Sequence, residues 1–439
     1  MKISVIGCGY LGAVHAAAMA ELGHDVFGID TNPERIAALG SGKAPFHEPG
    51  LNQLLRSNSN RLSFSRDISL ISDASVHFLA VGTPQSSDGS VEMSFVEEAI
   101  ENLLPYLSKG DLIVGKSTVP VGTASRIENK ISPSGAKLIW NPEFLREGFA
   151  VRDTLSPDRL VYGVSEKDSK SLTTEVLDEV YRKILDNGTP RLVMDFATAE
   201  LVKVAANSFL ATKISFINAM SEIADEVGAD IKQLADAIGH DDRIGRKFLN
   251  AGIGFGGGCL PKDIRGFIFR SEELGLDETL NILREVDKIN LRSRKRVGTL
   301  LREELGDLKD KKIAVWGISF KPDSDDIRDS PALYIAESLV QDGATVVAAD
   351  PKGFRPAEGK LSHLTKSGGL SLTEDHESAV EGAQALVVAT EWEIFKNANP
   401  KKIGSLMEDK IVIDGRNCLE SASWIKAGFV YRGIGRLAR

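Results

Sequence analysis

"KISVIGCGYLGAVHAAAMAELGHDVFGID" (Lys2–Asp30) is the stretch of sequence that decides the fold. The apolar run Lys2–Ile6 predicts a β-strand, and the alanine-rich segment that follows predicts a helix ending near Gly23. A second apolar run closes at Asp30 and predicts a second strand. Strand, helix and strand in this order form one βαβ unit, so the chain is predicted to begin with a parallel sheet.

Three glycines shape the turn between the first strand and the helix. Gly7, Gly9 and Gly12 form the pattern G-x-G-x-x-G, which allows a tight turn, close approach of a pyrophosphate and close packing of helix on strand. Asp30 stands eighteen residues after Gly12, where a carboxylate accepts hydrogen bonds from ribose hydroxyls. A carboxylate there would repel a 2′-phosphate, so the pattern favours NAD over NADP. The nearby cation of Arg35 fits either cofactor, or only a solvated helix.

The rest of the chain predicts two more regions, and with them a fold class of α/β with two doubly wound parallel-sheet domains joined by a helical region. Residues 1–196 contain further apolar runs separated by helical stretches and predict a mostly parallel sheet, the NAD-binding domain. Residues 197–308 carry long helical periodicity, interrupted by a glycine-dense segment that predicts a loop. Residues 309–439 begin with "KKIAVWGISF" and repeat the βαβ plan without the glycine triplet.

Composition excludes several classes of protein. The 439 residues carry a net charge of −9, which argues against a nucleic-acid partner because such a partner needs a cationic face. The three cysteines are far apart and lack metal-ligand spacing, so we expect no metal site, no disulfide framework and a cytoplasmic location. No apolar run is long enough to span a bilayer, and the early first strand leads us to expect neither a membrane association nor a signal peptide.

Polar or small residues follow several of the predicted strands. "VGTP" (Val81–Pro84) and "KSTVPVGT" (Lys116–Thr123) place small and hydroxylated residues at the carboxyl ends of strands, where open α/β sheets bind ligands. "NPEFLREG" (Asn141–Gly148) spaces two glutamates, Glu143 and Glu147, four residues apart. Each segment alone is also compatible with an ordinary turn. If the strand ends at an active site, one of these carboxylates could activate water.

Lys203 and Asn207 lie four residues apart on a predicted helix and therefore share one face. A solvated polar stripe is the alternative, although the neighbouring residues are apolar. A lysine in such a setting can stabilise an alkoxide.

Cys259 lies in "GFGGGCLPKD" (Gly254–Asp263), directly after a run of glycines. An inert buried thiol is the alternative to a reactive one. The glycines allow backbone to approach a ligand, while Lys262 offers a cation that favours thiolate and Asp263 a carboxylate that can move protons. Cys8 and Cys418 are predicted to be packing residues.

Taken together, these motifs resemble the UDP-glucose/GDP-mannose dehydrogenase family over essentially the full length. The motifs that carry the resemblance, in chain order, are "GCGYLG", "VGTP", "STVPVGT", "NPEFLREG", "ELVKVAANSFLATKISFINA", "RIGRKFLNAGIGFGGGCLPKD", "KPDSDDIRDSP" and "DGRN". The resemblance implies two Rossmann-like domains joined by a long central helix that forms a homodimer core or part of a higher oligomer. It also implies NAD-dependent oxidation of a nucleotide-linked hexose at C6 to the acid, with two NADH formed. Cys259 would then hold the aldehyde as a thiohemiacetal and next as a thioester.

The resemblance assigns roles to residues in three groups. The residues implied in catalysis are Cys259, Lys203, Asn207, Asp263, Thr118, Glu143 and Glu147. The residues implied in binding NAD are Gly7, Gly9, Tyr10, Leu11, Gly12, Asp30, Arg35, Gly82, Thr83, Pro84, Ser117, Thr118, Glu147, Lys262 and Arg328. The residues implied in binding the nucleotide sugar are Glu143, Phe144, Leu145, Arg146, Lys203, Asn207, Arg243, Asn250, Phe255, Gly256, Gly257, Phe320, Lys321 and Arg416. Arg243 is expected to reach across from a second subunit.

Two positions depart from the family pattern. Gly258 stands where many relatives have Ser, and Asn250 stands where some have Lys. Both bear on recognition of base and sugar rather than on the cysteine. "RIGRKFLNAGIGFGG" is closer to the UDP-glucose branch, with GDP-mannose and UDP-N-acetylmannosamine as alternative substrates. Two other readings remain: a one-step NAD-linked hydroxy-acid dehydrogenase, and a non-catalytic NAD-binding scaffold.

Overall fold

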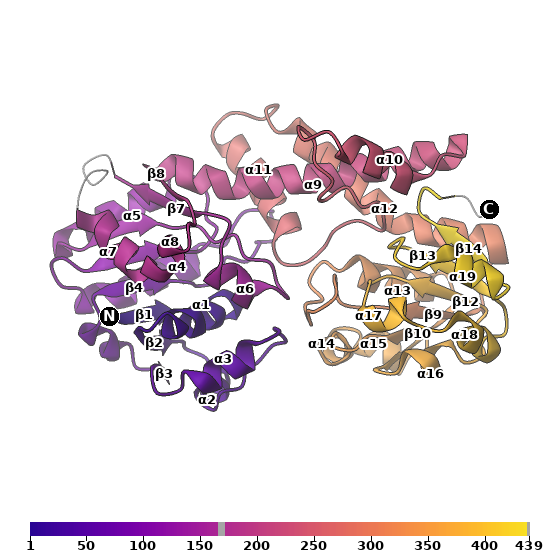
Figure 1. Cartoon of the computed structure of the whole chain (residues 1–439), viewed down its shortest axis with the longest axis horizontal. Coiled ribbons are helices and arrows are strands. Elements are labelled where there is room, and N and C mark those ends of the chain that lie inside the picture. Colours follow the sequence, from indigo (N-terminus) through magenta and orange to yellow (C-terminus); the bar gives the residue numbers. More distant parts are fainter. Residues whose placement is uncertain (166–171, 437–439) are drawn as a thin grey trace. The chain divides into compact units, whose positions relative to one another are not determined.

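The computed structural model describes residues 1–165 and 172–436. The chain divides into two compact units (Figure 1). Unit 1 comprises Met1–Ala206 and Arg265–Gly275, and unit 2 comprises Asn207–Ile264 and Leu276–Arg439. The three-part division predicted from the sequence stays a prediction.

Unit 1 is built on an eight-stranded sheet with the strand order β3-β2-β1-β4-β5-β6-β7-β8. Its strands are β1 (Lys2–Ile6), β2 (Asp25–Ile29), β3 (Leu62–Ser65), β4 (Val76–Leu79), β5 (Leu112–Gly115), β6 (Lys137–Trp140), β7 (Leu160–Val164) and β8 (Arg191–Asp195). Its helices are α1 (Tyr10–Glu21), α2 (Pro33–Gly40), α3 (Leu51–Ser57), α4 (Ser94–Leu103), α5 (Thr123–Ile131), α6 (Ala150–Leu155), α7 (Leu172–Val180) and α8 (Arg182–Asp186). Short 3-10 helices are η1 (Ile68–Asp73), η2 (Leu104–Tyr106) and η3 (Ser132–Ser134).

The first six strands of unit 1 are parallel in the 3-2-1-4-5-6 order of a dinucleotide-binding sheet. β7 pairs with β6 in the antiparallel direction, and β8 runs parallel to β7, so the sheet is mixed at this edge. The central strands are buried on both faces: Ile3 and Val5 belong to one apolar core, and Ile6 and Leu79 to another. This double burial explains the continuous apolar runs. The predicted βαβ unit at the N-terminus is confirmed.

Four helices follow the last strand of unit 1 along the chain. They are α9 (Phe196–Val227), α10 (Ile231–Gly239), α11 (Leu260–Glu273) and α12 (Asn281–Leu305). The prediction of a loop over Gly254–Asp263 is wrong for its last four residues, because α11 begins at Leu260. Pro261 lies in the first turn of α11, where its missing N–H costs nothing and its fixed φ suits a helix. None of the helices within the described residues has the length and apolar character needed to cross a bilayer.

Unit 2 repeats the strand order of unit 1 in a six-stranded, fully parallel sheet, β11-β10-β9-β12-β13-β14. Its strands are β9 (Lys312–Trp316), β10 (Thr345–Ala349), β11 (Leu370–Thr373), β12 (Ala385–Val388), β13 (Ile411–Asp414) and β14 (Val430–Gly433). Its remaining helices are α13 (Pro331–Gln341), α14 (Phe354–Lys360), α15 (Ser362–Lys366), α16 (His376–Val380), α17 (Glu393–Lys396), α18 (Pro400–Leu406) and α19 (Ser421–Lys426). The predicted fold class, two α/β domains with doubly wound sheets and a helical region, is confirmed.

The acidic residue after the second strand is used differently in unit 2. Asp350 follows β10 as Asp30 follows β2, but its side chain is fully buried. The carboxylate accepts six hydrogen bonds, from the backbone N–H groups of Ile318, Ser319, Lys352 and Gly353, from Ser319 Oγ and from Trp392 Nε1. Asp350 therefore joins the turn after β9 to its own turn after β10.

Candidate active site

The glycine turn of unit 1 is shaped for a dinucleotide. Gly7 has φ +87°, and a Cβ there would lie 2.8 Å from Val81 Cγ1. A Cβ on Gly12 would lie 1.8 Å from Gly7 O, whereas a Cβ on Gly9 would meet nothing within 4 Å. The turn is thus closed on its protein side and open over Gly9, where α1 begins with unpaired N–H groups that suit a pyrophosphate. The residues present fit NAD.

Asp30 and Arg35 lie together at the end of β2. Arg35 Nη1 donates to both carboxylate oxygens of Asp30 at 2.9 and 2.8 Å, and Asp30 Oδ2 also accepts from the backbone N–H of Cys8 at 2.8 Å. The carboxylate of Asp30 is therefore bonded to the glycine turn through Cys8 N, and its orientation is fixed by Arg35. Burial, and secondly the charge of Asp30, raise the pKa of the Cys8 thiol, which fits a packing role.

The loops after β4 and β5 touch at the carboxyl edge of the sheet. Ser117 Oγ donates to Val81 O at 2.7 Å, and Thr83 Oγ1 donates to Thr118 O at 2.9 Å. The structure therefore brings together the predicted cofactor residues of both loops, Gly82, Thr83 and Pro84 with Ser117 and Thr118.

Glu200 and Arg270 hold the Thr118 loop from two helices. Glu200, on α9, is buried and accepts the backbone N–H groups of Gly122 and Ala124, both at 2.7 Å, at the start of α5. Arg270, on α11, donates to Val121 O at 3.2 and 3.0 Å. Burial raises the pKa of Glu200, and the two N–H groups oppose that shift. Sequence reasoning missed this clamp because its partners lie far apart in the chain.

Glu143 is held tightly in the loop after β6. Its Oε1 accepts the backbone N–H groups of Phe144 at 2.8 Å and Leu145 at 3.2 Å, and its Oε2 lies 2.8 Å from Lys116 Nζ. Arg146, by contrast, is directed at Asp153 at 2.7 Å. The structure thus groups Glu143, Phe144 and Leu145, while the guanidinium of Arg146 pairs with α6.

Glu48 supports the segment around Glu147. Glu48 is buried and accepts the backbone N–H groups of Gly148 at 2.7 Å and Ala150 at 2.8 Å, which directly follow the buried Glu147. Tyr10, at the start of α1, donates its hydroxyl to Glu48 and accepts from Gly148 N at 3.1 Å. Glu48 therefore ties the loop before α3 to the predicted site, a link that the sequence did not reveal.

Lys203 and Asn207 both lie on α9, one turn apart, as predicted. Within unit 1, Lys203 Nζ lies 5.5 Å from the centre of the Phe144 ring, and Arg159 lies 3.9 Å from the same ring. Phe144 thus carries two cations near its ring. Lys203 is directed at the segment that holds Glu143.

Within unit 2, Cys259 lies between the glycine loop and α11. Its side chain is exposed, in contrast to the buried Cys8. Asp263, in the first turn of α11, is buried and accepts from Asn207 Nδ2 at 2.6 Å, and Lys262 Nζ lies 2.7 Å from its other oxygen. The structure therefore brings together Asn207, Lys262 and Asp263, with the charge of Lys262 directed at the carboxylate.

The glycine loop of unit 2 is packed against predicted substrate residues. Gly257 has φ +84°, and a Cβ there would lie 2.7 Å from the Phe320 ring. Gly257 N donates to Arg328 O at 2.8 Å, and Arg416 donates to Gly254 O at 2.9 Å and Phe320 O at 3.1 Å. Lys321 Nζ lies 5.2 Å from the Phe320 ring.

Asn290, on α12, pairs with the backbone of the glycine loop. Its side-chain amide accepts from Phe255 N at 2.7 Å and donates to Phe255 O at 3.0 Å. A Cβ on Gly256 would lie 2.3 Å from Asp329 O, and a Cβ on Gly258 would lie 2.3 Å from the Arg328 guanidinium carbon. Phe255, Gly256, Gly257, Phe320, Lys321, Arg328 and Arg416 thus form one cluster.

One ion pair of Arg243 and one hydrogen bond of Asn250 are made outside that cluster. The Arg243 side chain is 89 % exposed and forms an ion pair of 2.6 Å with Asp241. Asn250 accepts from Arg246 Nη1 at 2.8 Å. Their predicted roles in substrate binding stay predictions.

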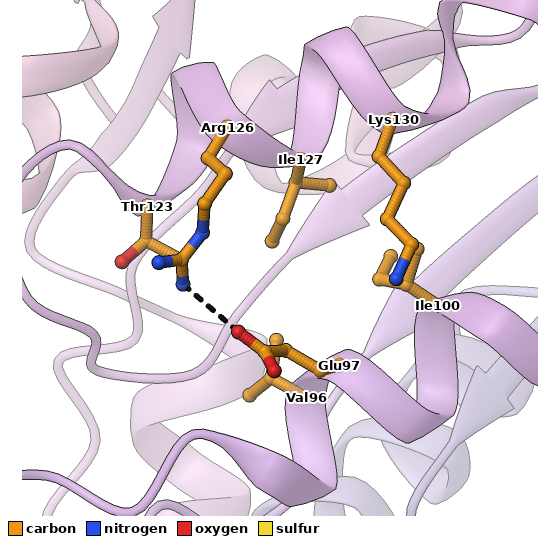
Figure 2. Close-up of a pocket in the computed structure, with 7 residues that line it drawn as sticks. All are labelled: Val96, Glu97, Ile100, Thr123, Arg126, Ile127 and Lys130. Atoms are coloured by element: carbon orange, nitrogen blue, oxygen red, sulfur yellow. Dashed lines mark ion pairs between the residues drawn. The ribbon is translucent and has the colours of Figure 1, made fainter.

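A pocket between α4 and α5 is lined by none of the predicted site residues (Figure 2). It is lined by Val96, Glu97, Ile100, Thr123, Arg126, Ile127 and Lys130. Arg126 pairs with Glu97 at 3.3 Å, and Lys130 pairs with Glu101 at 2.6 Å. Because both cations already have carboxylate partners, the pocket does not resemble an anion site.

A dinucleotide turn in unit 1 and an exposed cysteine after a glycine loop in unit 2 are features of an NAD-binding dehydrogenase. Comparison with protein families agrees. Residues 1–185 match the NAD binding domain of the UDP-glucose/GDP-mannose dehydrogenase family, residues 197–292 its central domain and residues 314–421 its UDP binding domain. The chain belongs to the UDP-glucose/GDP-mannose dehydrogenase family, and it is an NAD-dependent enzyme whose substrate is a nucleotide sugar.

Three relatives show how far the similarity extends. The UDP-glucose 6-dehydrogenase of Pseudomonas aeruginosa is 40% identical over 452 residues, with 99% of this chain and 98% of the relative covered. The structure of a UDP-glucose dehydrogenase from Pyrobaculum islandicum is 34% identical with a TM-score of 0.89, covering 99% of this chain and 98% of that one. A UDP-D-ManNAc dehydrogenase structure from Pyrococcus horikoshii is 28% identical with a TM-score of 0.85, covering 99% of both chains.

Proposed function

We propose that this enzyme oxidises UDP-glucose at C6 to UDP-glucuronate and forms two NADH per sugar. The observation that carries the proposal is the exposed Cys259 thiol beside a buried Asn207–Asp263 pair at the start of α11. A one-step dehydrogenase needs no nucleophile, whereas two successive oxidations need one that retains the aldehyde. The choice of sugar is supported by the UDP-glucose 6-dehydrogenases among the relatives.

In the first oxidation the side chains act on the C6 hydroxyl. Lys203, Asn207 and Asp263 orient this oxygen and stabilise its negative charge as its proton leaves. NAD, when bound at the glycine turn, accepts the hydride of each oxidation. The amide of Asn207 is fixed by its 2.6 Å hydrogen bond to Asp263, so it has little freedom to lose on binding substrate.

The second oxidation depends on Cys259. Its sulfur adds to the aldehyde carbon and the aldehyde oxygen takes a proton, which gives a thiohemiacetal. Loss of a second hydride and a proton gives a thioester. Water, oriented by Thr118 and Glu143, then adds to the thioester carbon, and the acid and the free thiol are released.

The nucleotide is assigned to unit 2. Phe255 and Gly256 lie in the glycine loop, and Lys321 and Arg416 supply cations near Phe320. Arginine and lysine suit a diphosphate, because they donate charge-assisted hydrogen bonds to its oxygens. The match to a UDP binding domain over residues 314–421 supports uridine as the base.

A homodimer completes the proposal. Phe209, Phe216 and Ile223 recur every seven residues on α9, and their side chains are 67%, 48% and 55% exposed. A heptad-spaced apolar stripe of this kind is typical of helices that pack against a second copy. Arg243, highly exposed on its turn, is then available to a neighbouring subunit. Residues 1–196, 197–308 and 309–439 would serve as cofactor, dimerisation and nucleotide-sugar regions of a cytoplasmic enzyme.

A panel of nucleotide sugars tests the proposal. UDP-glucose, GDP-mannose and UDP-N-acetylmannosamine are incubated separately with excess NAD or NADP, and the reduced cofactor is counted per sugar consumed. We expect about two equivalents of NADH with UDP-glucose and far slower reaction with NADP. A Cys259→Ser variant should stall before the acid. One equivalent from the unchanged enzyme indicates a one-step dehydrogenase, and no turnover with any sugar indicates a binding scaffold.

A further inference from the structure

Lys116 is a buried cation next to a residue of the proposed hydrolysis step. It follows β5 directly, and its side chain is only 4% exposed. Its ammonium lies 2.8 Å from Glu143 Oε2 and donates to Asn141 Oδ1 at 3.1 Å. Burying an ammonium group is costly unless it is paired with a carboxylate, so a buried lysine at this position indicates a specific role for the ion pair with Glu143.

The two oxygens of the Glu143 carboxylate have different partners. Oε1 already accepts two backbone N–H groups, those of Phe144 and Leu145. Within residues 1–165 and 172–436, Oε2 interacts with Lys116 alone, and a carboxylate oxygen has two acceptor sites. The second acceptor site of Oε2 is therefore the one that suits a water molecule.

The other titratable groups around the pair are neutral. Burial lowers the pKa of His15, on α1, well below its usual value, and the charge of Lys116 lowers it further. Burial raises the pKa of Tyr181, between α7 and α8, well above its usual value, and the charge of Glu143 adds to this. The Tyr181 ring lies 6.0 Å from Lys116 Nζ, and its hydroxyl donates to Asn141 Oδ1 at 2.9 Å. Lys116 is thus the cation that faces Glu143 in this buried group.

We propose that Lys116 is a positioning residue that fixes the carboxylate of Glu143 in place, so that Glu143 Oε2 can accept a proton from the water that hydrolyses the thioester. The water then adds to the thioester carbon as one of its protons passes to Glu143 Oε2. The C–S bond to Cys259 breaks, and the leaving sulfur takes up that proton from Glu143, which returns the carboxylate and the thiol to their starting states. Without Lys116, Glu143 Oε2 loses the partner that fixes it, and the carboxylate no longer holds the water in one place. This inference rests on the proposed function.

A Lys116→Met variant tests this role in the full-length enzyme. The Cys259 adduct is followed by mass spectrometry after rapid quenching with UDP-glucose and NAD, and NADH is recorded in parallel. We expect normal formation of the thioester and at least tenfold slower loss of the adduct, because the water that hydrolyses it is no longer held by a fixed carboxylate. Lys130→Met, which removes an exposed lysine from a surface pair, is the matched control and should behave as the unchanged enzyme.

A second comparison guards against simple misfolding. Glu143→Gln should slow hydrolysis at every pH, and Lys116→Met combined with Glu143→Gln should be no slower than Glu143→Gln alone, because the lysine acts through the glutamate. Removing both charges also avoids leaving one buried ion unpaired. Unchanged hydrolysis in Lys116→Met, an equal slowing of thioester formation and of hydrolysis, or additive losses in the double variant each overturn the inference. Failure of the proposed function would instead appear in the unchanged enzyme, as the absence of a thioester adduct.

Discussion

Replacing Asp350 by asparagine should destabilise unit 2 without touching the chemistry. The carboxylate is fully buried and accepts six hydrogen bonds, so it stabilises the turn after β9 and the turn after β10 by joining them. Asparagine has the same shape, but one of its two side-chain atoms is a donor. That NH₂ group must face N–H groups whichever way the amide is turned.

The structure sets the size of the effect. In the less harmful orientation the amide nitrogen takes the place of Oδ1, and the N–H groups of Lys352 and Gly353 lose their acceptor. Each buried donor left without a partner costs about 1–3 kcal/mol. Because the buried charge is also removed, we expect a net loss of about 3 kcal/mol. For a unit of this size that corresponds to a fall in Tm of roughly 6–12 °C.

Scanning calorimetry measures this loss, and Asp30→Asn is the matched control. Asp30 occupies the same place in the repeated plan, but one of its partners is the partly exposed side chain of Arg35. We expect Asp30→Asn to lower Tm by less than Asp350→Asn, because one backbone N–H (Cys8 or Asn32) rather than two loses its acceptor. It should raise the KM for NAD about tenfold or more, since a hydrogen bond to a charged group contributes about 1.5–3 kcal/mol. A shift in Tm below about 1 °C for Asp350→Asn would refute the reasoning, as would equal shifts for the two variants.

Two further predictions concern assembly and pH. Phe216→Glu combined with Ile223→Glu should convert a dimer to a monomer in sedimentation equilibrium, because charged side chains at heptad positions cannot be buried in a helix interface. As a control, Ile394→Glu changes an equally exposed apolar residue on α17 and should leave the mass unchanged. A dimer that survives the double change contradicts the assignment of α9 to the interface. Because burial keeps His15 neutral in the folded chain while the unfolded chain binds a proton below about pH 6.5, stability is lost as pH falls below that value, by up to about 1.4 kcal/mol per pH unit. His15→Phe should therefore reduce the difference in urea stability between pH 7.5 and pH 5 by up to about 2 kcal/mol, and an unchanged difference counts against this account.

Local sequence signals predicted much of the fold. The glycine spacing, the apolar runs and Asp30 predicted the first βαβ unit, because these are properties of neighbouring residues. The direction of β7 was not visible, since a strand has the same pattern in either direction and its pairing depends on distant residues. The start of α11 at Leu260 was missed because the glycine content of Gly254–Gly258 outweighed the helix signal of Pro261.

The sequence motifs predicted the site residues themselves, but they did not predict the side chains that hold those residues in place. Lys116 lies inside a quoted motif, but nothing in its neighbours indicates that it is buried against Glu143. Glu48 and Glu200 act on backbone N–H groups about 100 and 76–78 residues away, and such contacts leave no periodic pattern. Side chains that orient a site through the main chain of another segment can be found only once the chain is folded.

The grip of Glu48 on Gly148 and Ala150 has a practical consequence for protein engineers. The stretch 41–50 looks like a harmless surface connection, the kind of place chosen for tags, insertions or circular permutation. Cutting or lengthening this stretch would displace Glu48 and free the main chain beside Glu147, about a hundred residues further along. The enzyme would keep every sequence motif, but the loop that carries Glu147 would no longer be held in position.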